Sequence, residues 1–204
     1  MKFLLTSALL VITLTPGCGG VALAAPIATL APIFAAHARK DYATELKLLR
    51  PLVDKGDGDA QFLLGVMYDN GQGVAQDYKE AVRLYRLAAE QGNAKAQNNL
   101  GFMYDNGTGV AQDYKEAVRL YRLASAQGNA IAQSNLGMMY ENATGVAQDY
   151  VRAHMWYNLG AISGDSRNAS SNRDDIAKKM TPSQIERAQD LASKCQASKF
   201  KKCD

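Results

Sequence analysis

Residues 92–127 read GNAKAQNNLGFMYDNGTGVAQDYKEAVRLYRLASAQ, and closely similar 36-residue segments stand directly before and after them. Aligned without a gap, residues 56–91 match this segment at 27 of 36 positions, and residues 128–163 match it at 21 of 36. A fixed period of this length is typical of arrays in which each unit packs on its neighbours. The sequence therefore predicts stacked repeats over residues 56–163 and not a globule around one pocket.

Each unit predicts two helices, which we name helix A and helix B. In the middle unit, helical spacing runs from Ala94 to Asn106, and Gly107 then gives a turn signal. Asp113 precedes the second helix, with Glu116 three residues later in the pattern of a capping box. Helix B then runs to about Gln127. A hairpin of this kind cannot bury its apolar faces alone, so its neighbours must stack on it.

One glycine recurs inside helix A of every unit, where glycine costs about 1 kcal/mol relative to alanine. Close approach of helix B, where an alanine recurs, would offset that cost. We therefore interpret these glycines as packing contacts and not as ligand sites. The glycines are Gly65, Gly101 and Gly137, and the alanines are Ala81, Ala117 and Ala153.

The N-terminus has the layout of a secretory signal peptide. Lys2 is followed by an apolar run from Phe3 to Leu14 and by small residues at Ala22-Leu23-Ala24, which predicts a signal peptide over residues 1–24. Two alternatives stay open. In the first, Cys18 is a lipidated N-terminus. In the second, the apolar segment is an uncleaved membrane anchor that continues to Ala36, although Pro32 argues against one continuous helix there. Cleavage predicts a periplasmic or secreted protein without stable membrane insertion.

The charges give no electrostatic case for nucleic acid as a partner. The chain has 23 Lys and Arg against 20 Asp and Glu, and removal of Lys2 with the signal leaves a net charge of +2. One basic cluster lies in the predicted tail, residues 197–204, and we interpret it as solvated; a weak contact with anionic envelope lipid or polymer is the alternative.

Two cysteines, Cys195 and Cys203, remain if Cys18 leaves with the signal. In an oxidising compartment, thiols this near to each other pair more often than they stay free. We predict a disulfide that fastens the last helix. A redox centre usually has a C-x-x-C spacing beside a βαβ pattern, which this sequence lacks.

The repeat pattern resembles that of a known family. Ala-x-x-x-Leu-Gly-x-Met-Tyr-x-Asn-Gly-x-Gly-Val-x-x-Asp-Tyr-x-x-Ala is similar to the Sel-1-like repeat (SLR), a relative of the tetratricopeptide repeat. The resemblance implies an all-α fold, a right-handed α-solenoid of helix-turn-helix units, in which helix A lines the inner curve. It also implies an adaptor or scaffold for other proteins. A cysteine-rich branch of the family has a disulfide in each repeat, and this chain departs from it.

The flanking segments predict caps for the array. Residues 25–55 contain a linker and capping helices, the first of them around Ile33 to Arg39. Residues 164–196 predict a capping helix pair, over about 166–180 and 181–195. Thr181, Pro182 and Gln184 open the second of these helices with a capping box. Trp156 replaces a leucine of the earlier units, and we interpret it as packing that seals the last interface; an aromatic anchor for a partner is the alternative.

The sequence contains few residues in patterns typical of catalytic or metal-binding sites. We therefore predict no catalytic residue, no metal and no cofactor. The two histidines, His37 and His154, are interpreted as structural or surface residues. No zinc-protease, nucleophile-elbow or Walker pattern occurs. Asp77, Asp113 and Asp149 are interpreted as helix caps and not as calcium ligands.

Partner specificity should arise where near-identical repeats differ on helix A. Counted from the first differing position of each helix A, these positions have offsets of 0, 3, 4 and 7 residues. This spacing places them on one helical face. A groove that mixes apolar side chains with amides suits a peptide or helix. The predicted partner-binding residues are Asp59, Phe62, Leu63, Val66, Lys95, Asn98, Asn99, Phe102, Ile131, Ser134, Asn135 and Met138.

Two functions follow from the sequence. The first is an exported, non-enzymatic, monomeric scaffold that binds a protein or peptide on the concave face of the array. The second is a cell-envelope enzyme or a binder of small molecules related to the cell wall. The repeat signature and the lack of a nucleophile–base pair favour the first.

Overall fold

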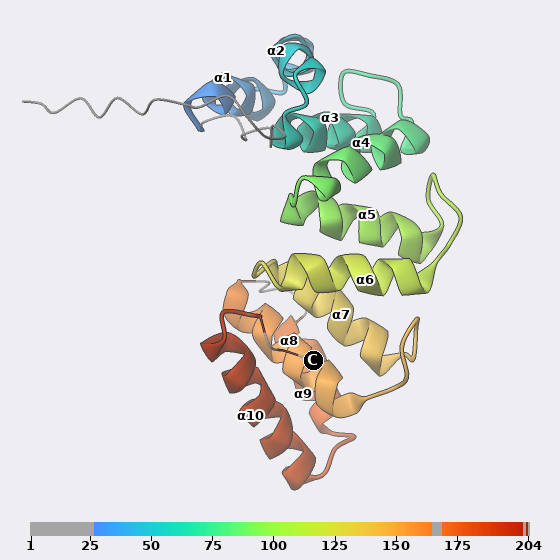
Figure 1. Ribbon diagram of the computed structural model, residues 1–204, viewed down its shortest axis with the longest axis vertical. Helices are drawn as coiled ribbons and strands as arrows, with labels where there is room; N and C mark the ends of the chain where they lie inside the picture. The colour runs from blue at the N-terminus through green and yellow to red at the C-terminus, as the bar shows by residue number, and fades with distance from the viewer. Residues whose placement is uncertain (1–26, 165–168, 202, 204) are drawn as a thin grey trace, which may run out of the picture.

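The computed structural model describes residues 27–164, 169–201 and 203, and the helices within them stack into an elongated array (Figure 1). These residues contain no strand, and none of their helices has the length and apolar character needed to cross a bilayer. The all-α solenoid is therefore as predicted, while the predicted signal peptide lies outside the described residues. The helices are α1 (Ile27–Ala38), α2 (Tyr42–Asp54), α3 (Gly58–Asn70), α4 (Tyr78–Glu90), α5 (Ala94–Asn106), α6 (Tyr114–Ser125), α7 (Ala130–Glu141), α8 (Tyr150–Ser163), α9 (Ala169–Ala177) and α10 (Pro182–Ala197).

The repeats form three hairpins, α3 with α4, α5 with α6 and α7 with α8, and their connectors lie along one edge of the array (Figure 1). In the second hairpin, α5 ends at Gly107, which adopts the left-handed conformation with φ of 68°. Asp113 then caps α6 by accepting the backbone N–H groups of Lys115 and Glu116. The predicted capping box is wrong here, because the backbone N–H of Asp113 donates to the carbonyl of Tyr104 at 3.0 Å and the Glu116 carboxylate accepts from Arg119 instead, at 2.7 and 2.6 Å.

The glycine of each helix A faces a tyrosine ring of helix B. A Cβ atom on Gly101 would lie 2.9 Å from Cε1 of Tyr121, and one on Gly137 would lie 2.8 Å from Cδ1 of Tyr157. The expected packing role holds, but the close contact is this ring and not the alanine four residues earlier. The Ala117 carbonyl oxygen is farther away than the ring, at 3.4 Å. A larger side chain in place of the glycine would have to displace a fully buried ring.

Each of the first two hairpins is closed by a hydrogen bond between two glutamine side chains. Nε2 of Gln91 donates to Oε1 of Gln61, and Nε2 of Gln127 donates to Oε1 of Gln97, both at 2.8 Å. Gln97 in turn donates to the carbonyl of Ala89 in the preceding hairpin, at 3.2 Å. Gln97 therefore takes part in closing its own hairpin and also joins it to the preceding one.

The N-terminal helices differ from the prediction at α1. This helix begins at Ile27 and not near Ile33, and it continues through Pro32, which is exposed. Water can therefore satisfy the carbonyl that loses its helical partner at this proline. Nδ1 of His37 lies 3.0 Å from the carboxylate of the buried Glu45 and so ties α1 to α2.

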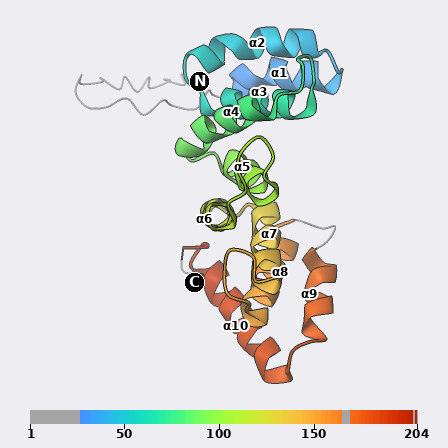
Figure 2. The same cartoon turned by 90° about the vertical axis from the view of Figure 1, so that its right-hand side faces the viewer.

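At the other end, α9 and α10 both pack against α8, on either side of it in Figure 2. They were predicted as a helix pair, yet each uses α8 as its main partner, because the large apolar side chains of α8 need cover on both sides. The predicted capping box of α10 is confirmed. Thr181 accepts from the N–H of Gln184, and Gln184 accepts from the N–H of Thr181 at 2.8 Å.

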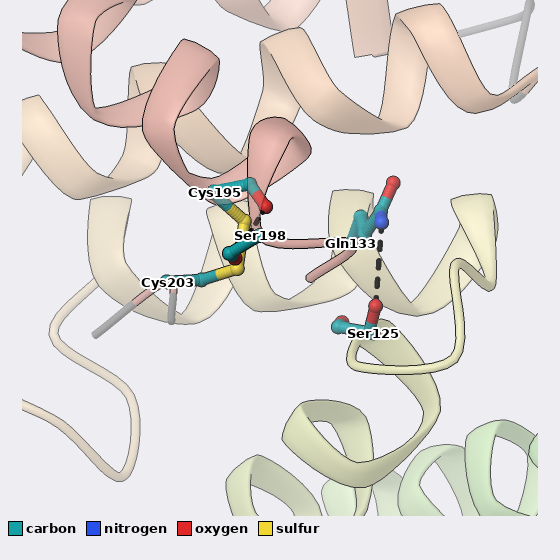
Figure 3. The surroundings of a disulfide bond; sticks show 5 residues. All are labelled: Ser125, Gln133, Cys195, Ser198 and Cys203. Atoms are coloured by element: carbon teal, nitrogen blue, oxygen red, sulfur yellow. Dashed lines mark hydrogen bonds between the residues drawn. A yellow bond between two sulfur atoms is a disulfide. The ribbon is translucent and has the colours of Figure 1, made fainter. Parts of the chain in front are cut away.

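The chain returns to the array after α10. A disulfide joins Cys195 to Cys203 with their Cα atoms 4.6 Å apart, and Figure 3 shows it beside residues of α6 and α7. Residues 198–201 with Cys203 form what we name the C-terminal loop. Its Phe200 ring covers Gly128, 3.3 Å from where a Cβ atom would stand. The described part of the predicted tail therefore packs on the start of the third repeat through Phe200, while Lys199 and Lys201 are exposed.

Candidate partner-binding face

The predicted partner-binding residues all lie on the A helices α3, α5 and α7, but only part of the set is accessible. Lys95 is exposed, and so are three apolar side chains: Phe102 at 54%, Ile131 at 55% and Met138 at 38%. These residues occupy offsets 0 and 7 of the repeat. Half-buried residues fill the remaining positions at offsets 0, 4 and 7, and with the four exposed residues they form what we name the helix-A face. The half-buried members are Asp59, Leu63, Val66, Asn99 and Asn135.

The three residues at offset 3 are less accessible than the exposed members of the helix-A face, since Phe62 is half-buried and Asn98 and Ser134 are buried. The Phe62 ring lies 5.9 Å from the ring of Tyr85, centroid to centroid. Asn98 and Ser134 are both buried, and Ser134 donates to the carbonyl of Ala130. Offset 3 turns toward the neighbouring helices because it lies about 40° around the helix from offset 7 and about 60° from offset 0, on the side that helix B covers. Asn98 and Ser134 therefore support the face and do not form it, while Phe62 is partly accessible.

Amide side chains connect the second and third A helices. Nδ2 of Asn135 donates to Oδ1 of Asn98 at 3.1 Å, and Nδ2 of Asn98 donates to Oδ1 of Asn99 at 3.2 Å. Because both polar atoms of Asn98 are satisfied within the chain, this residue has little left to offer a ligand. The exposed apolar side chains and Lys95 remain as the accessible part of this stretch.

A groove of about 460 Å³ opens at the N-terminal end of the helix-A face, between α1, α3 and the start of α5. Its apolar walls include Leu30 and Phe34 of α1 with Phe62 and Leu63 of α3, and Lys95 lies at its border. Leu30 and Phe34 were missed by the sequence reasoning, which began this helix near Ile33. Their spacing of four residues just before the repeats is the signal that could have placed them on the same side.

Polar groups near the face have local structural partners. The hydroxyl of Tyr85 donates to Asp69 at 3.1 Å, and that of Tyr157 donates to Glu141 at 2.9 Å. Burial raises the pKa of Tyr85 and of Tyr157, so both hydroxyls stay protonated and act as donors. Burial also raises the pKa of Asp69, while the hydrogen bond from Tyr85 lowers it. Because such pairs link helix A to helix B inside a hairpin, we interpret them as structural.

The histidines lie apart from each other, in α1 and α8. His154 is buried, and burial lowers its pKa, with a further lowering by the charge of Arg173. The described residues contain no group of three or more His, Cys, Asp or Glu that could hold a metal ion.

The repeats match the family model of the Sel1 repeat at residues 58–93, 94–129 and 130–165. The chain belongs to the Sel1 repeat family. This register is the predicted 36-residue period shifted by two residues. Sel1 repeat proteins are generally scaffolds for protein–protein interaction.

Two solved structures show the likeness at the level of the whole fold. A Sel1 repeat protein from Oxalobacter formigenes is 30% identical with a TM-score of 0.63, and the alignment covers 83% of this chain and 77% of that one. A protective antigen from uropathogenic Escherichia coli strains, with an SLR fold, is 27% identical with a TM-score of 0.59. This alignment covers 76% of the present chain and 42% of the antigen. No curated protein matches the sequence.

Proposed function

We propose that this Sel1 repeat protein is an exported, non-enzymatic and monomeric scaffold that binds a protein or peptide on its helix-A face. The observation that carries the proposal is the exposure of Phe102, Ile131 and Met138 on α5 and α7. Exposed apolar side chains scattered singly are ordinary, but these three lie on adjacent A helices, with Phe102 and Met138 at equivalent repeat positions and Ile131 seven residues before Met138 on the same helical face. Together with the groove beside Phe34, they offer a partner an apolar contact along the concave side of the array.

Export rests on two observations. The order of basic, apolar and small residues before Ala25 is that of a secretory leader. The disulfide between Cys195 and Cys203 is of the kind that persists in an oxidising compartment. The proposed mature protein begins near Ala25, in the periplasm or outside the cell. N-terminal sequencing of the protein from cells tests this, and an intact Met1 or lipid on Cys18 would contradict it.

The chain offers a closely matched pair of variants to test the face. Ile131 on α7 and Ile162 on α8 are exposed to 55% and 56%, but only Ile131 belongs to the helix-A face. Immobilised wild type, Ile131→Ser and Ile162→Ser are each exposed to envelope extract, and the retained proteins are quantified by mass spectrometry. Loss of one buried isoleucine contact should weaken partner binding by about tenfold for Ile131→Ser. The Ile162→Ser variant should bind as the wild type does.

Equal retention by all three proteins would remove the helix-A face as the binding surface. The second function, a cell-envelope enzyme or a binder of small molecules, would be favoured by a different result. In that case a folded His154→Ala variant would lose biological activity while Ile131→Ser kept it. No observation on the described residues favours that function now, because His37 contacts the Glu45 carboxylate and neither histidine belongs to a described group of three or more possible metal ligands.

A further inference from the structure

A second groove, of about 450 Å³, lies between α4, α5 and α6, and we name it the α4–α6 groove. Leu100, Leu120 and Leu123 give it apolar walls, and Gly92 adds bare backbone. None of the residues that line it belongs to the helix-A face. The repeat predicts an equivalent groove one unit later, and the structure contains one, between α6 and α8.

In the third unit, the chain itself provides an occupant for the equivalent groove. The C-terminal loop contributes Phe200, Lys201 and Cys203 to the wall of that groove. The Phe200 ring lies on the backbone of Gly128, with Cε2 at 3.3 Å from where a Cβ atom would stand. The disulfide from Cys195 to Cys203 fastens the loop in this place. The third unit therefore shows which kind of segment packs on such a groove.

Gly92 presents the same surface without a ring on it. It stands one repeat before Gly128, and the two glycines share the left-handed conformation, with φ of 87° and 79°. No atom of another residue lies within 4 Å of where a Cβ atom on Gly92 would stand. Because the two backbones have the same shape and neither has a side chain, both suit the face of an aromatic ring.

The charges of the α4–α6 groove indicate what should stand beside that ring. Glu116 is paired with Arg119 at 2.6 and 2.7 Å, and Arg86 donates to the hydroxyl of Tyr104 at 3.1 Å. Glu90 is exposed and forms no ion pair with another described residue. The equivalent residue of the third unit is an alanine, so this carboxylate distinguishes the α4–α6 groove from its occupied counterpart. It is complementary to a basic side chain.

We propose that the α4–α6 groove binds a segment of another protein in which an aromatic residue is followed by a lysine or arginine. The ring packs on Gly92 and the leucine walls, and the cation lies at Glu90. The chain's own loop has this pattern at Phe200 and Lys201, but its disulfide and its contact with Gly128 hold it one unit away. The proposal concerns a second binding surface and does not depend on the helix-A face.

A peptide copy of the C-terminal loop is the probe. The disulfide-closed peptide Cys-Gln-Ala-Ser-Lys-Phe-Lys-Lys-Cys, with the sequence of residues 195–203, is labelled with fluorescein and titrated with the full protein. Fluorescence anisotropy should give a dissociation constant of roughly 0.1 mM, because ring closure lowers the ordering cost but the contact area is small. The same peptide with alanine in place of phenylalanine should bind at least about tenfold more weakly. Equal binding of the two peptides would overturn the proposal.

Two pairs of variants locate the site on the protein. Leu123→Ser removes an apolar wall and should weaken binding by about fivefold, while Ile162→Ser, at an exposed residue outside both grooves, should leave binding unchanged. Glu90→Gln should weaken binding by about threefold, and Glu186→Gln, an equal charge change on the exposed side of α10, should not. Leu123 also lines the groove of the third unit, whereas Glu90 lines only the α4–α6 groove. Unchanged binding by folded Glu90→Gln would therefore overturn the proposal, with folding checked by circular dichroism.

Sedimentation velocity separates a partner protein from a second copy of this chain. The protein alone should remain monomeric at the concentrations used for the titration. Association that increases with concentration and is weakened in Glu90→Gln would mean that the groove takes the C-terminal loop of another copy. That result would overturn the assignment to a different protein.

Discussion

The second hairpin, α5 with α6, and the third, α7 with α8, are built on nearly the same sequence but are completed in different ways. Both keep the contact between a helix-A glycine and a helix-B tyrosine. Only the second has the glutamine pair, because Ser163 stands where Gln127 would recur. Oε1 of Gln133 is consequently buried without a partner among the described residues, although its Nε2 still donates to the Ser125 carbonyl at 3.4 Å (Figure 3).

The third hairpin gains apolar and covalent contacts in place of the polar pair. His154, Met155 and Trp156 replace Val118, Arg119 and Leu120, and all three side chains are buried. The disulfide then holds the C-terminal loop against the same region. The difference shows how an array is ended: the last unit has no following repeat, so residues that would face one are recruited to pack against a cap.

The largest effect is expected at the contact that both hairpins share. Gly101→Val and Gly137→Val should each lower the free energy of unfolding by about 3 kcal/mol, since the added side chain must displace a buried tyrosine ring. Urea denaturation measures the loss, with Lys95→Ala as an exposed control that should change stability by less than about 0.5 kcal/mol. If only one glycine were sensitive, the two hairpins would not share this packing.

The next effect should be confined to the third hairpin. Replacing Cys195 and Cys203 together by serine should lower the free energy of unfolding by about 2 kcal/mol, close to what the chain-entropy model gives for so short a loop. Trp156 fluorescence should change as well, because the C-terminal loop lines the same cavity as the indole. The wild type treated with a dithiol reductant serves as the chemical counterpart of the variant. An unchanged stability in both experiments would mean that the loop does not hold the end of the array.

A pH dependence should also distinguish the hairpins, because His154 occupies the place of Val118. Burial lowers its pKa from the ordinary 6.5, so the unfolded chain binds a proton more readily than the folded protein does. Stability is therefore full above that pH and falls below it, by at most about 1.4 kcal/mol per pH unit. Between pH 7.5 and 5.5 the wild type should lose more stability than His154→Val, as measured by urea denaturation at each pH. Parallel losses in the two proteins would exclude His154 as the cause.

The fold was predictable because its signals are local and repeated. The period, the turn glycines and the aspartate caps each depend on a few neighbouring residues, and the observed helices of the repeats begin and end within two residues of the prediction. The disulfide cysteines were also apparent, since Cys195 and Cys203 stand only eight positions apart.

The candidate site was predicted less well because accessibility depends on neighbours that periodicity does not reveal. Helical offsets placed Asn98 on the same side as Phe102, yet Asn98 is buried against Asn135 of the next helix A. The contribution of Phe34 to the groove depends on where α1 packs, and the position of Phe200 depends on the return of the chain after α10. These are tertiary contacts between distant segments, and a single sequence specifies them only through the folded structure.

The smallest effect expected is a gain. Ser163→Gln should give the third hairpin the residue that closes the second one, where Gln127 donates to Gln97 at 2.8 Å. An unsatisfied buried acceptor costs more than an ordinary hydrogen bond contributes, and Oε1 of Gln133 is such an acceptor. Because position 163 is exposed at the end of α8, the longer side chain has room but loses some rotamer freedom when it binds. The net gain in the free energy of unfolding should therefore be about 0.5 kcal/mol, read from the urea midpoint. Ser163→Ala provides the control, since alanine has a similar helix propensity or better but no donor; equal midpoints for the glutamine and alanine variants would show that the gain comes from the helix and not from a restored pair.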